Sequence, residues 1–172
     1  ITILLFFTLD IIVDYVLFPQ AENKRRDDFL DNSLGSKFST SSSIDYYDNE
    51  EIAKGLHKAA INQFENCFFS YSLLKALTFK KIIVPAIVFL TIWVFAYYGF
   101  RNVSIALSFL QVFFSVNVLG GLIRHLILLT RLSVIYDNWV TLFQDENFRS
   151  NPSRYQPHIL RYWLKYETLH ST

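Results

Sequence analysis

An uncharged apolar segment over residues 82–100 constrains this chain more than any other feature. Lys80 and Lys81 flank it on one side and Arg101 on the other. Its length matches the roughly 20 residues that an α-helix needs to cross the hydrocarbon core of a bilayer. Pro85 lies where we expect the first turn of this helix, a place where a missing N–H costs little. The segment therefore predicts a transmembrane helix.

A second apolar run over residues 103–123 follows after two residues, so the pair predicts a helical hairpin. Polar residues recur in this run, mostly at spacings of three and four, which places them on one stripe of a helix. We expect that stripe to face other helices or water, because lipid is a poor environment for it. Its members are Ser104, Ser108, Gln111, Ser115 and Asn117. The alternative that the pattern leaves open is a hairpin that forms the core of a soluble helical bundle.

Composition agrees with a membrane protein. Hydrophobic residues make up 52% of the 172 residues, while Asp, Glu, Lys and Arg reach only 18%, against roughly 25% in soluble domains. The net charge of +1 provides no global field that would attract nucleic acid. The single Cys67 excludes an intramolecular disulfide, and none of the four histidines has a second histidine or a cysteine at helical spacing. We expect neither a metal nor a cofactor.

Residues 1–20 predict an N-terminal transmembrane helix that ends at Pro19. The segment has no basic start and no small-residue cleavage site, which favours a retained helix over a signal peptide. Asp10 and Asp14 are one helical turn apart and share a face. Repeated around an oligomer, they would form an acidic ring that favours cations. In the alternative, this helix end lies at the membrane–water interface and both carboxylates are solvated.

The remaining segments predict an all-α fold of membrane-embedded helices with a cytoplasmic amphipathic helical bundle. Residues 21–79 comprise a polar linker, up to about residue 48, and an amphipathic helix from residue 50 that Asn49 caps. Residues 80–130 form the apolar hairpin, whose second helix continues out of the bilayer, and residues 131–172 contain cytoplasmic helices. The basic residues flank membrane ends that would lie on one side, which the positive-inside rule makes cytoplasmic. They are Lys24, Arg25, Arg26, Lys80, Lys81, Arg124 and Arg131.

One polar cluster precedes the last helix and is the candidate for chemistry. An arginine and a histidine near a helix N-terminus can position a phosphate and transfer protons, as RNA cleavage requires. The alternative is an ordinary solvated helix start. The candidate residues are Arg149, Asn151, Arg154 and His158.

With these features the chain resembles the small accessory membrane proteins of type VI-B CRISPR systems. The resemblance rests on chain size, the apolar N-terminal helix, the all-helical body and the late Arg/Asn/His cluster. Members of that family carry a divergent HEPN motif, in which an arginine and a polar residue, often asparagine, precede a histidine. Arg154 and His158 match its ends, whereas Asn151 lies before the arginine and Arg149 is too far from the histidine.

The resemblance implies a function in defence against phage. It implies a homo-oligomeric, octameric pore in the bacterial inner membrane that depolarises the membrane after an RNA-guided RNase effector has found phage transcripts. The effector and membrane lipid are then the expected partners. A membrane-tethered HEPN-type ribonuclease that acts on RNA, or a docking protein that conducts nothing, are the alternatives.

Overall fold

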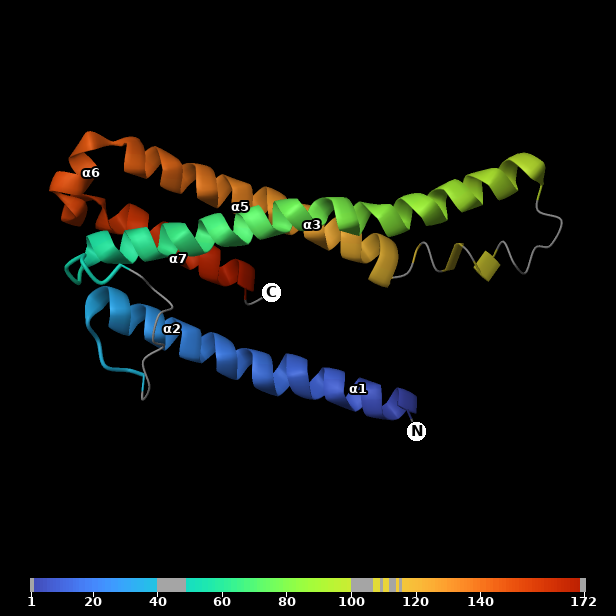
Figure 1. The fold of residues 1–172 in the computed structure, drawn as a ribbon, viewed down its shortest axis with the longest axis horizontal. Coiled ribbons are helices and arrows are strands. Elements are labelled where there is room, and N and C mark those ends of the chain that lie inside the picture. Colours follow the sequence, from blue (N-terminus) through green and yellow to red (C-terminus); the bar gives the residue numbers. More distant parts are fainter. Residues whose placement is uncertain are drawn as a thin grey trace. The chain divides into compact units, whose positions relative to one another are not determined.

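The computed structural model describes residues 2–39, 49–99, 107–108, 110–111, 114 and 116–170. All regular structure in these ranges is helical and they contain no strand, which confirms the predicted all-α class (Figure 1). The chain divides into two compact units. The first comprises Ile1–Gln63 and Glu146–Ile159, and the second comprises Phe64–Asp145 and Leu160–Thr172.

The first unit starts with helical backbone that runs through three successive elements. These are α1 (Thr2–Ile12), a π-helical turn (Val13–Leu17) and α2 (Phe18–Leu34). The predictions that the helix ends at Pro19 and that a linker begins at residue 21 are therefore wrong. The Phe18 N–H donates to the carbonyl of Val13, five residues back. This wider turn lies directly before Pro19, which has no N–H to donate, and so lets the helix continue past the proline.

The end of α2 is set by Gly35, whose φ of 79° is in the left-handed region. Its N–H donates to the carbonyl of Asp31. Gly55 lies nearby in the same unit, and its N–H donates to the carbonyl of Ser33 at 2.8 Å. The next helix, α3 (Leu56–Tyr98), begins directly after Gly55 and not at residue 50 as predicted.

The structure merges two predicted helices into α3, which has 43 residues. Pro85 consequently lies in the interior of a helix, and its predicted place in a first turn is wrong. An interior proline removes one backbone hydrogen bond and commonly bends a helix. The amphipathic pattern and the apolar segment were predicted correctly as helical, but no helix end separates them.

In the second unit, α3 pairs with α5 (Gly121–Gln144), which follows a π-helical turn (Val116–Gly120). Three contacts set the register. The rings of Phe64 and Phe143 lie 5.1 Å apart and those of Tyr71 and Tyr136 5.0 Å apart. Thr78 Oγ1 lies 3.0 Å from Nε2 of His125. Residue numbers rise along α3 while they fall along α5, so the two helices are antiparallel.

The chain returns through two short elements in the first unit, α6 (Glu146–Ser150) and a 3₁₀ turn (Pro152–Tyr155), to α7 (Gln156–His170). In the second unit α7 packs against α3 and α5. The hydroxyl of Tyr166 lies 2.8 Å from Ser70 Oγ and donates to the carbonyl of Asn66 at 3.3 Å. The rings of Trp139 and Tyr162 meet edge to face at 5.3 Å. The second unit is thus a three-helix assembly over this part of α3.

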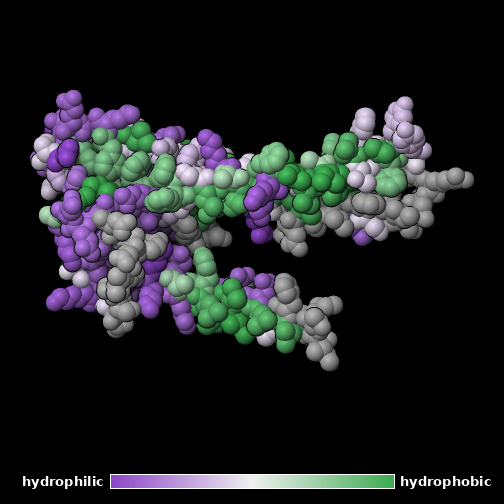
Figure 2. Space-filling view, in the orientation of Figure 1, coloured by the Kyte–Doolittle hydropathy of each residue, from purple (hydrophilic) through white to green (hydrophobic). Residues whose placement is uncertain are grey.

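Two helices are long and apolar enough to span a membrane, Leu56–Tyr98 and Val118–Gln144. Only 6% of the most apolar part of the first and 17% of the second is buried within the described chain. The core helix of a soluble protein would be mostly buried, so these values argue against the soluble-bundle alternative. Figure 2 shows the apolar surface of α3 open on the visible face. The turn of the predicted hairpin lies outside the described residues.

Candidate functional sites

The acidic pair lies on an open apolar helix surface. Asp10, near the end of α1, and Asp14, in the π-helical turn, are both exposed. Large apolar side chains surround them, including Leu9, which is 53% exposed, and Tyr15, which is 78% exposed. Within the described part of the chain, no hydrogen bond or ion pair reaches either carboxylate. Such carboxylates are costly in lipid and need water, a cation or a second chain.

The predicted polar stripe is only partly visible. Ser108 and Gln111 are exposed. Asn117 lies in the π-helical turn Val116–Gly120, whereas Ser104 and Ser115 lie outside the described residues. The described part is therefore compatible with a stripe that faces another chain or water, and the stripe stays a prediction.

The Arg/Asn/His cluster lies on the surface of the first unit, and all four side chains are exposed. Arg149 ends α6, Asn151 precedes the 3₁₀ turn, Arg154 lies in it, and His158 lies in the first turn of α7. The Arg154 N–H donates to the Asn151 carbonyl at 3.2 Å. No hydrogen bond or ion pair joins the Arg154 and His158 side chains. The fold brings the four residues into one turn-rich segment without assembling them into a preformed site.

Phe148 anchors this segment to the core of the first unit, because it is only 1% exposed. Its ring lies 5.7 Å from that of His57 and 5.6 Å from that of Tyr155. The Tyr155 ring in turn lies 6.4 Å from the ring of His158. His158 therefore occupies the exposed end of a row of rings that starts in the core.

Sequence reasoning missed a buried polar network around Asn62. The Asn62 side chain is fully buried and donates to Asn32 Oδ1 and Ser33 Oγ, each at 3.0 Å. It also accepts a hydrogen bond from Asn49 Nδ2 at 2.9 Å. Asn49 is not the predicted N-cap, because α3 begins only at Leu56. A possible signal was a polar residue among alanines on the apolar face of the helix. The network joins α2, the segment before α3, and α3 itself.

Asp31 holds the chain after α2 in place. Its carboxylate accepts hydrogen bonds from the backbone N–H of Phe38 at 2.9 Å, from that of Ser39 at 2.8 Å, and from Ser36 Oγ at 2.8 Å. The Phe38 N–H, followed by the Ser39 N–H and the Ser36 hydroxyl, holds the pKa of Asp31 below its ordinary value. The segment after Gly35 is thereby fixed along α2.

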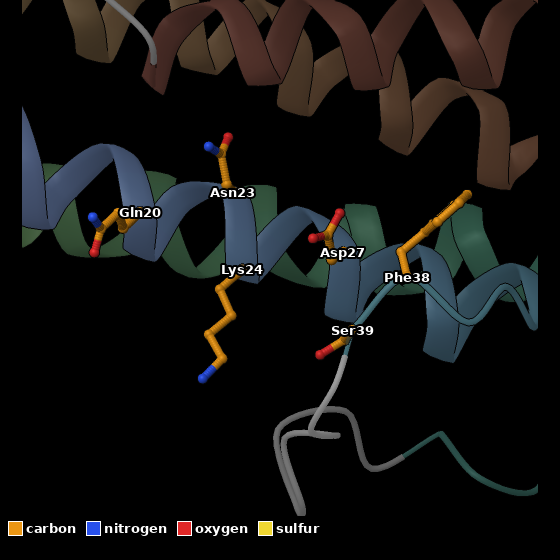
Figure 3. Close-up of a pocket in the computed structure, with 6 residues that line it drawn as sticks. All are labelled: Gln20, Asn23, Lys24, Asp27, Phe38 and Ser39. Carbon is orange, nitrogen blue, oxygen red and sulfur yellow. The ribbon is translucent and has the colours of Figure 1, made fainter.

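A cavity of about 310 Å³ lies between α2 and this segment. Figure 3 shows that Asn23 and Lys24 point in opposite directions and that the labelled side chains do not converge on a common point. The lining residues are Gln20, Asn23, Lys24, Asp27, Phe38 and Ser39. The cavity is a consequence of how Asp31 folds the chain and lacks the convergent polar groups of a ligand site.

Metal chemistry has no candidate in the described ranges, where no group of three or more His, Cys, Asp or Glu side chains is arranged to hold an ion. The acidic pair, the exposed part of the stripe and the Arg/Asn/His cluster are thus the features that bear on function. Comparisons of the chain with protein-family models, with curated proteins and with solved structures found no match.

Proposed function

We propose that this chain is an integral membrane protein whose copies assemble into a pore. The observation that carries the proposal is the exposed pair Asp10 and Asp14 within a run of exposed apolar side chains. In a bilayer a single copy would leave both carboxylates against hydrocarbon, which is costly. A ring of copies that turns this face inward gives each carboxylate water and places an acidic ring on a cation path.

The apolar half of α3 supports insertion into lipid. Ile87 is 59% exposed, Phe89 is 58% exposed and Trp93 is 61% exposed. These side chains would cost about 25 cal/mol for every Å² of apolar surface left in water. Lipid removes that cost without a protein partner. The excess of basic residues at the ends of the apolar segments further supports a bacterial inner membrane with the polar segments in the cytoplasm.

The first experiment measures ion conduction. Full-length protein reconstituted into planar bilayers is expected to conduct cations in preference to anions. Asp10→Asn combined with Asp14→Asn removes the acidic ring and should lower the cation-to-anion permeability ratio severalfold. Asp27→Asn, which makes the same chemical change in α2 beyond the apolar segment, is the matched control and should leave the ratio unchanged.

Two results would contradict the pore. One is protein that inserts into bilayers but passes no current, which would favour the docking alternative. The other is protein that stays monomeric in mild detergent, because a single copy cannot surround a water path. Particle averages that show a ring with a central hole would support the proposal and give the number of copies.

The resemblance to type VI-B CRISPR accessory proteins supports a function for this pore in defence against phage. In that setting the RNA-guided RNase effector controls opening, and the open pore depolarises the inner membrane. Co-expression with an effector and a matching transcript should collapse the signal of a potential-sensitive dye. An effector without a matching transcript is the control, and unchanged potential in both cases would contradict this part of the proposal.

The ribonuclease alternative is favoured by one observation, the exposure of both Arg154, in the 3₁₀ turn, and His158, in the first turn of α7. Purified protein should then cut single-stranded RNA, and His158→Ala should abolish cutting because it removes the proton-transfer group. His170→Ala, which removes the histidine at the other end of α7, is the control. Intact RNA after incubation with the wild-type chain would exclude this alternative.

A further inference from the structure

The middle of the chain contains basic residues but no acidic ones. Between Glu65 and Asp137 the sequence contains no Asp or Glu. The same stretch carries six basic residues: Lys75, Lys80, Lys81, Arg101, Arg124 and Arg131. Most of α3 and much of α5 belong to this stretch, so cations on this helix pair have no acidic partner close in sequence.

The contact between Thr78 and His125 sets the register of α3 and α5, and with it the positions of Lys81 and Arg124 along the helix axes. The Thr78 hydroxyl donates to the Leu74 carbonyl at 2.9 Å. Its single proton is thereby used, so Oγ1 accepts the hydrogen bond from Nε2–H of His125 at 3.0 Å. Lys81 follows Thr78 by three residues and Arg124 directly precedes His125. Because the helices are antiparallel, both steps lead toward the same end of the pair, and at 1.5 Å per residue the two cations differ in height by about 3 Å.

Helical geometry also gives the side to which each cation points. Successive residues turn by about 100° around a right-handed helix. Starting from Thr78 and His125, which face each other, Lys81 and Arg124 both turn to the same side of the plane that contains the two helix axes. Lys80 turns away from α5. Ser70, eight residues before Thr78, points to the same side as Lys81. At Ser70 this side of α3 is covered by α7, whose Tyr166 hydroxyl lies 2.8 Å from Ser70 Oγ.

The two cations are open for a ligand. Lys81 and Arg124 are exposed, and neither makes a hydrogen bond or ion pair within the described part of the chain. The apolar segment starts at the next residue of α3, and Val84, on the same side as Lys81, is 54% exposed. Figure 2 shows a narrow hydrophilic patch that interrupts the apolar surface of α3 on the visible face. Cations thus lie at the border of an exposed apolar surface.

We propose that Lys81 and Arg124 form a binding site for the phosphodiester headgroup of an anionic phospholipid, whose acyl chains lie along the adjacent apolar surface of α3. The guanidinium of Arg124 offers paired donors to phosphate oxygens, and the ammonium of Lys81 adds a point charge. A membrane surface supplies this ligand wherever basic side chains border an apolar span. The site rests on the membrane insertion that the proposed function requires.

The experiment measures lipid binding to the full-length protein in a nonionic detergent by native mass spectrometry. Phosphatidylglycerol is the anionic probe and phosphatidylcholine the zwitterionic one. The wild-type chain should bind phosphatidylglycerol more tightly. Lys81→Gln and Arg124→Gln should each weaken that binding about fivefold. The matched control is Lys80→Gln, the same change at the adjacent residue that points away from α5, and it should change binding by less than about twofold.

The double variant Lys81→Arg with Arg124→Lys retains both charges and should retain the preference for phosphatidylglycerol. Equal weakening by Lys80→Gln and Lys81→Gln would overturn the site, because it would indicate diffuse attraction. Displacement of the lipid by an equal concentration of inorganic phosphate would overturn it as well, since the ligand would then be a free anion. Quenching of Trp93 fluorescence by brominated lipid reports insertion independently, so the lipid site can fail while membrane insertion stands.

Discussion

Asn62 and Gln63 are adjacent residues of α3 that are both fully buried, yet they differ in hydrogen bonding. Asn62 makes three side-chain hydrogen bonds. Neither amide atom of Gln63, which is 1% exposed, has a partner in the described part of the chain. A buried polar group without a partner costs about 1–3 kcal/mol. The pair therefore tests how much the network contributes to stability.

We expect Asn62→Ala to lower the free energy of unfolding by about 2–3 kcal/mol, because it leaves groups of Asn32, Ser33 and Asn49 unsatisfied. Gln63→Leu should be neutral or stabilising by about 1 kcal/mol, since it replaces an unsatisfied amide by an apolar side chain of similar size. Thermal unfolding in mild detergent, followed by circular dichroism, measures both. Equal destabilisation by the two variants would show that the hydrogen bonds of Asn62 contribute nothing particular to the free energy of unfolding.

Asp31 gives a pH dependence with a defined sign. Its folded pKa is lowered by the N–H groups of Phe38 and Ser39, so its contribution is complete above the ordinary value of 3.8. The contribution is lost as the pH falls through the lowered pKa. Amide exchange of Phe38 and Ser39, corrected for its intrinsic pH dependence, should therefore remain slow down to about pH 4 and accelerate below it.

Asp31→Asn should loosen the same segment at neutral pH, because an amide offers one acceptor oxygen where the carboxylate offers two. Tryptic cleavage after Lys37, which is exposed and lies between Ser36 and Phe38, is expected to become severalfold faster. Asp137→Asn, the same change at an exposed residue of α5 in the other unit, is the control and should leave the rate unchanged. An unchanged rate in Asp31→Asn would mean that the segment is held by other contacts.

At the scale of elements, the hydroxyl of Tyr166 joins α7 to α3 by hydrogen bonds. Tyr166 is 4% exposed and its hydroxyl contacts both Ser70 and the Asn66 carbonyl. Tyr166→Phe should cost about 1 kcal/mol of unfolding free energy and leave the helices packed. Tyr97→Phe removes the same hydroxyl from a residue that is 77% exposed and should cost nothing measurable. A Tyr166→Phe chain as stable as the Tyr97→Phe chain would show that the hydrogen bonds of Tyr166 do not stabilise the packing of α7 on α3.

Elements with an apolar stripe could be predicted from the sequence, whereas α2 could not. The α3 and α5 patterns gave helices because apolar residues recur at three- and four-residue spacing. In α2 the apolar side chains are few and only Phe29 and Ser33 are buried, so the helix depends on local terms. One of these is the ion pair between Glu22 and Arg25 at 3.0 Å. Another is the left-handed Gly35 that ends the helix.

The candidate sites were predicted to different degrees. The sequence indicated the acidic pair and the Arg/Asn/His cluster, and the structure adds their exposure. The spacing that pointed to a catalytic arginine and histidine could not tell whether their side chains meet. The cation pair of Lys81 and Arg124 was beyond sequence reasoning, because it depends on the register that the contact of Thr78 with His125 sets between two helices.

For the whole molecule, membrane insertion makes a prediction that separates lipid from water. Trp93 is 61% exposed on the apolar part of α3, whereas Trp139 is fully buried. In a reconstituted chain that retains only Trp93, brominated acyl chains should quench the fluorescence strongly and aqueous iodide weakly. A chain that retains only Trp139 should resist both quenchers. Strong quenching of Trp93 by iodide would show that this part of α3 lies in water.

The position of Pro85 also determines how α3 responds to force. A helix of 43 residues is about 65 Å long at 1.5 Å per residue, roughly twice the thickness of the hydrocarbon core. One part of α3 must therefore extend beyond the bilayer when the other spans it. The backbone is least stiff at the interior proline, where a hydrogen bond is missing. A force on the projecting part is therefore expected to bend α3 at Pro85, while the helical segments on either side stay straight.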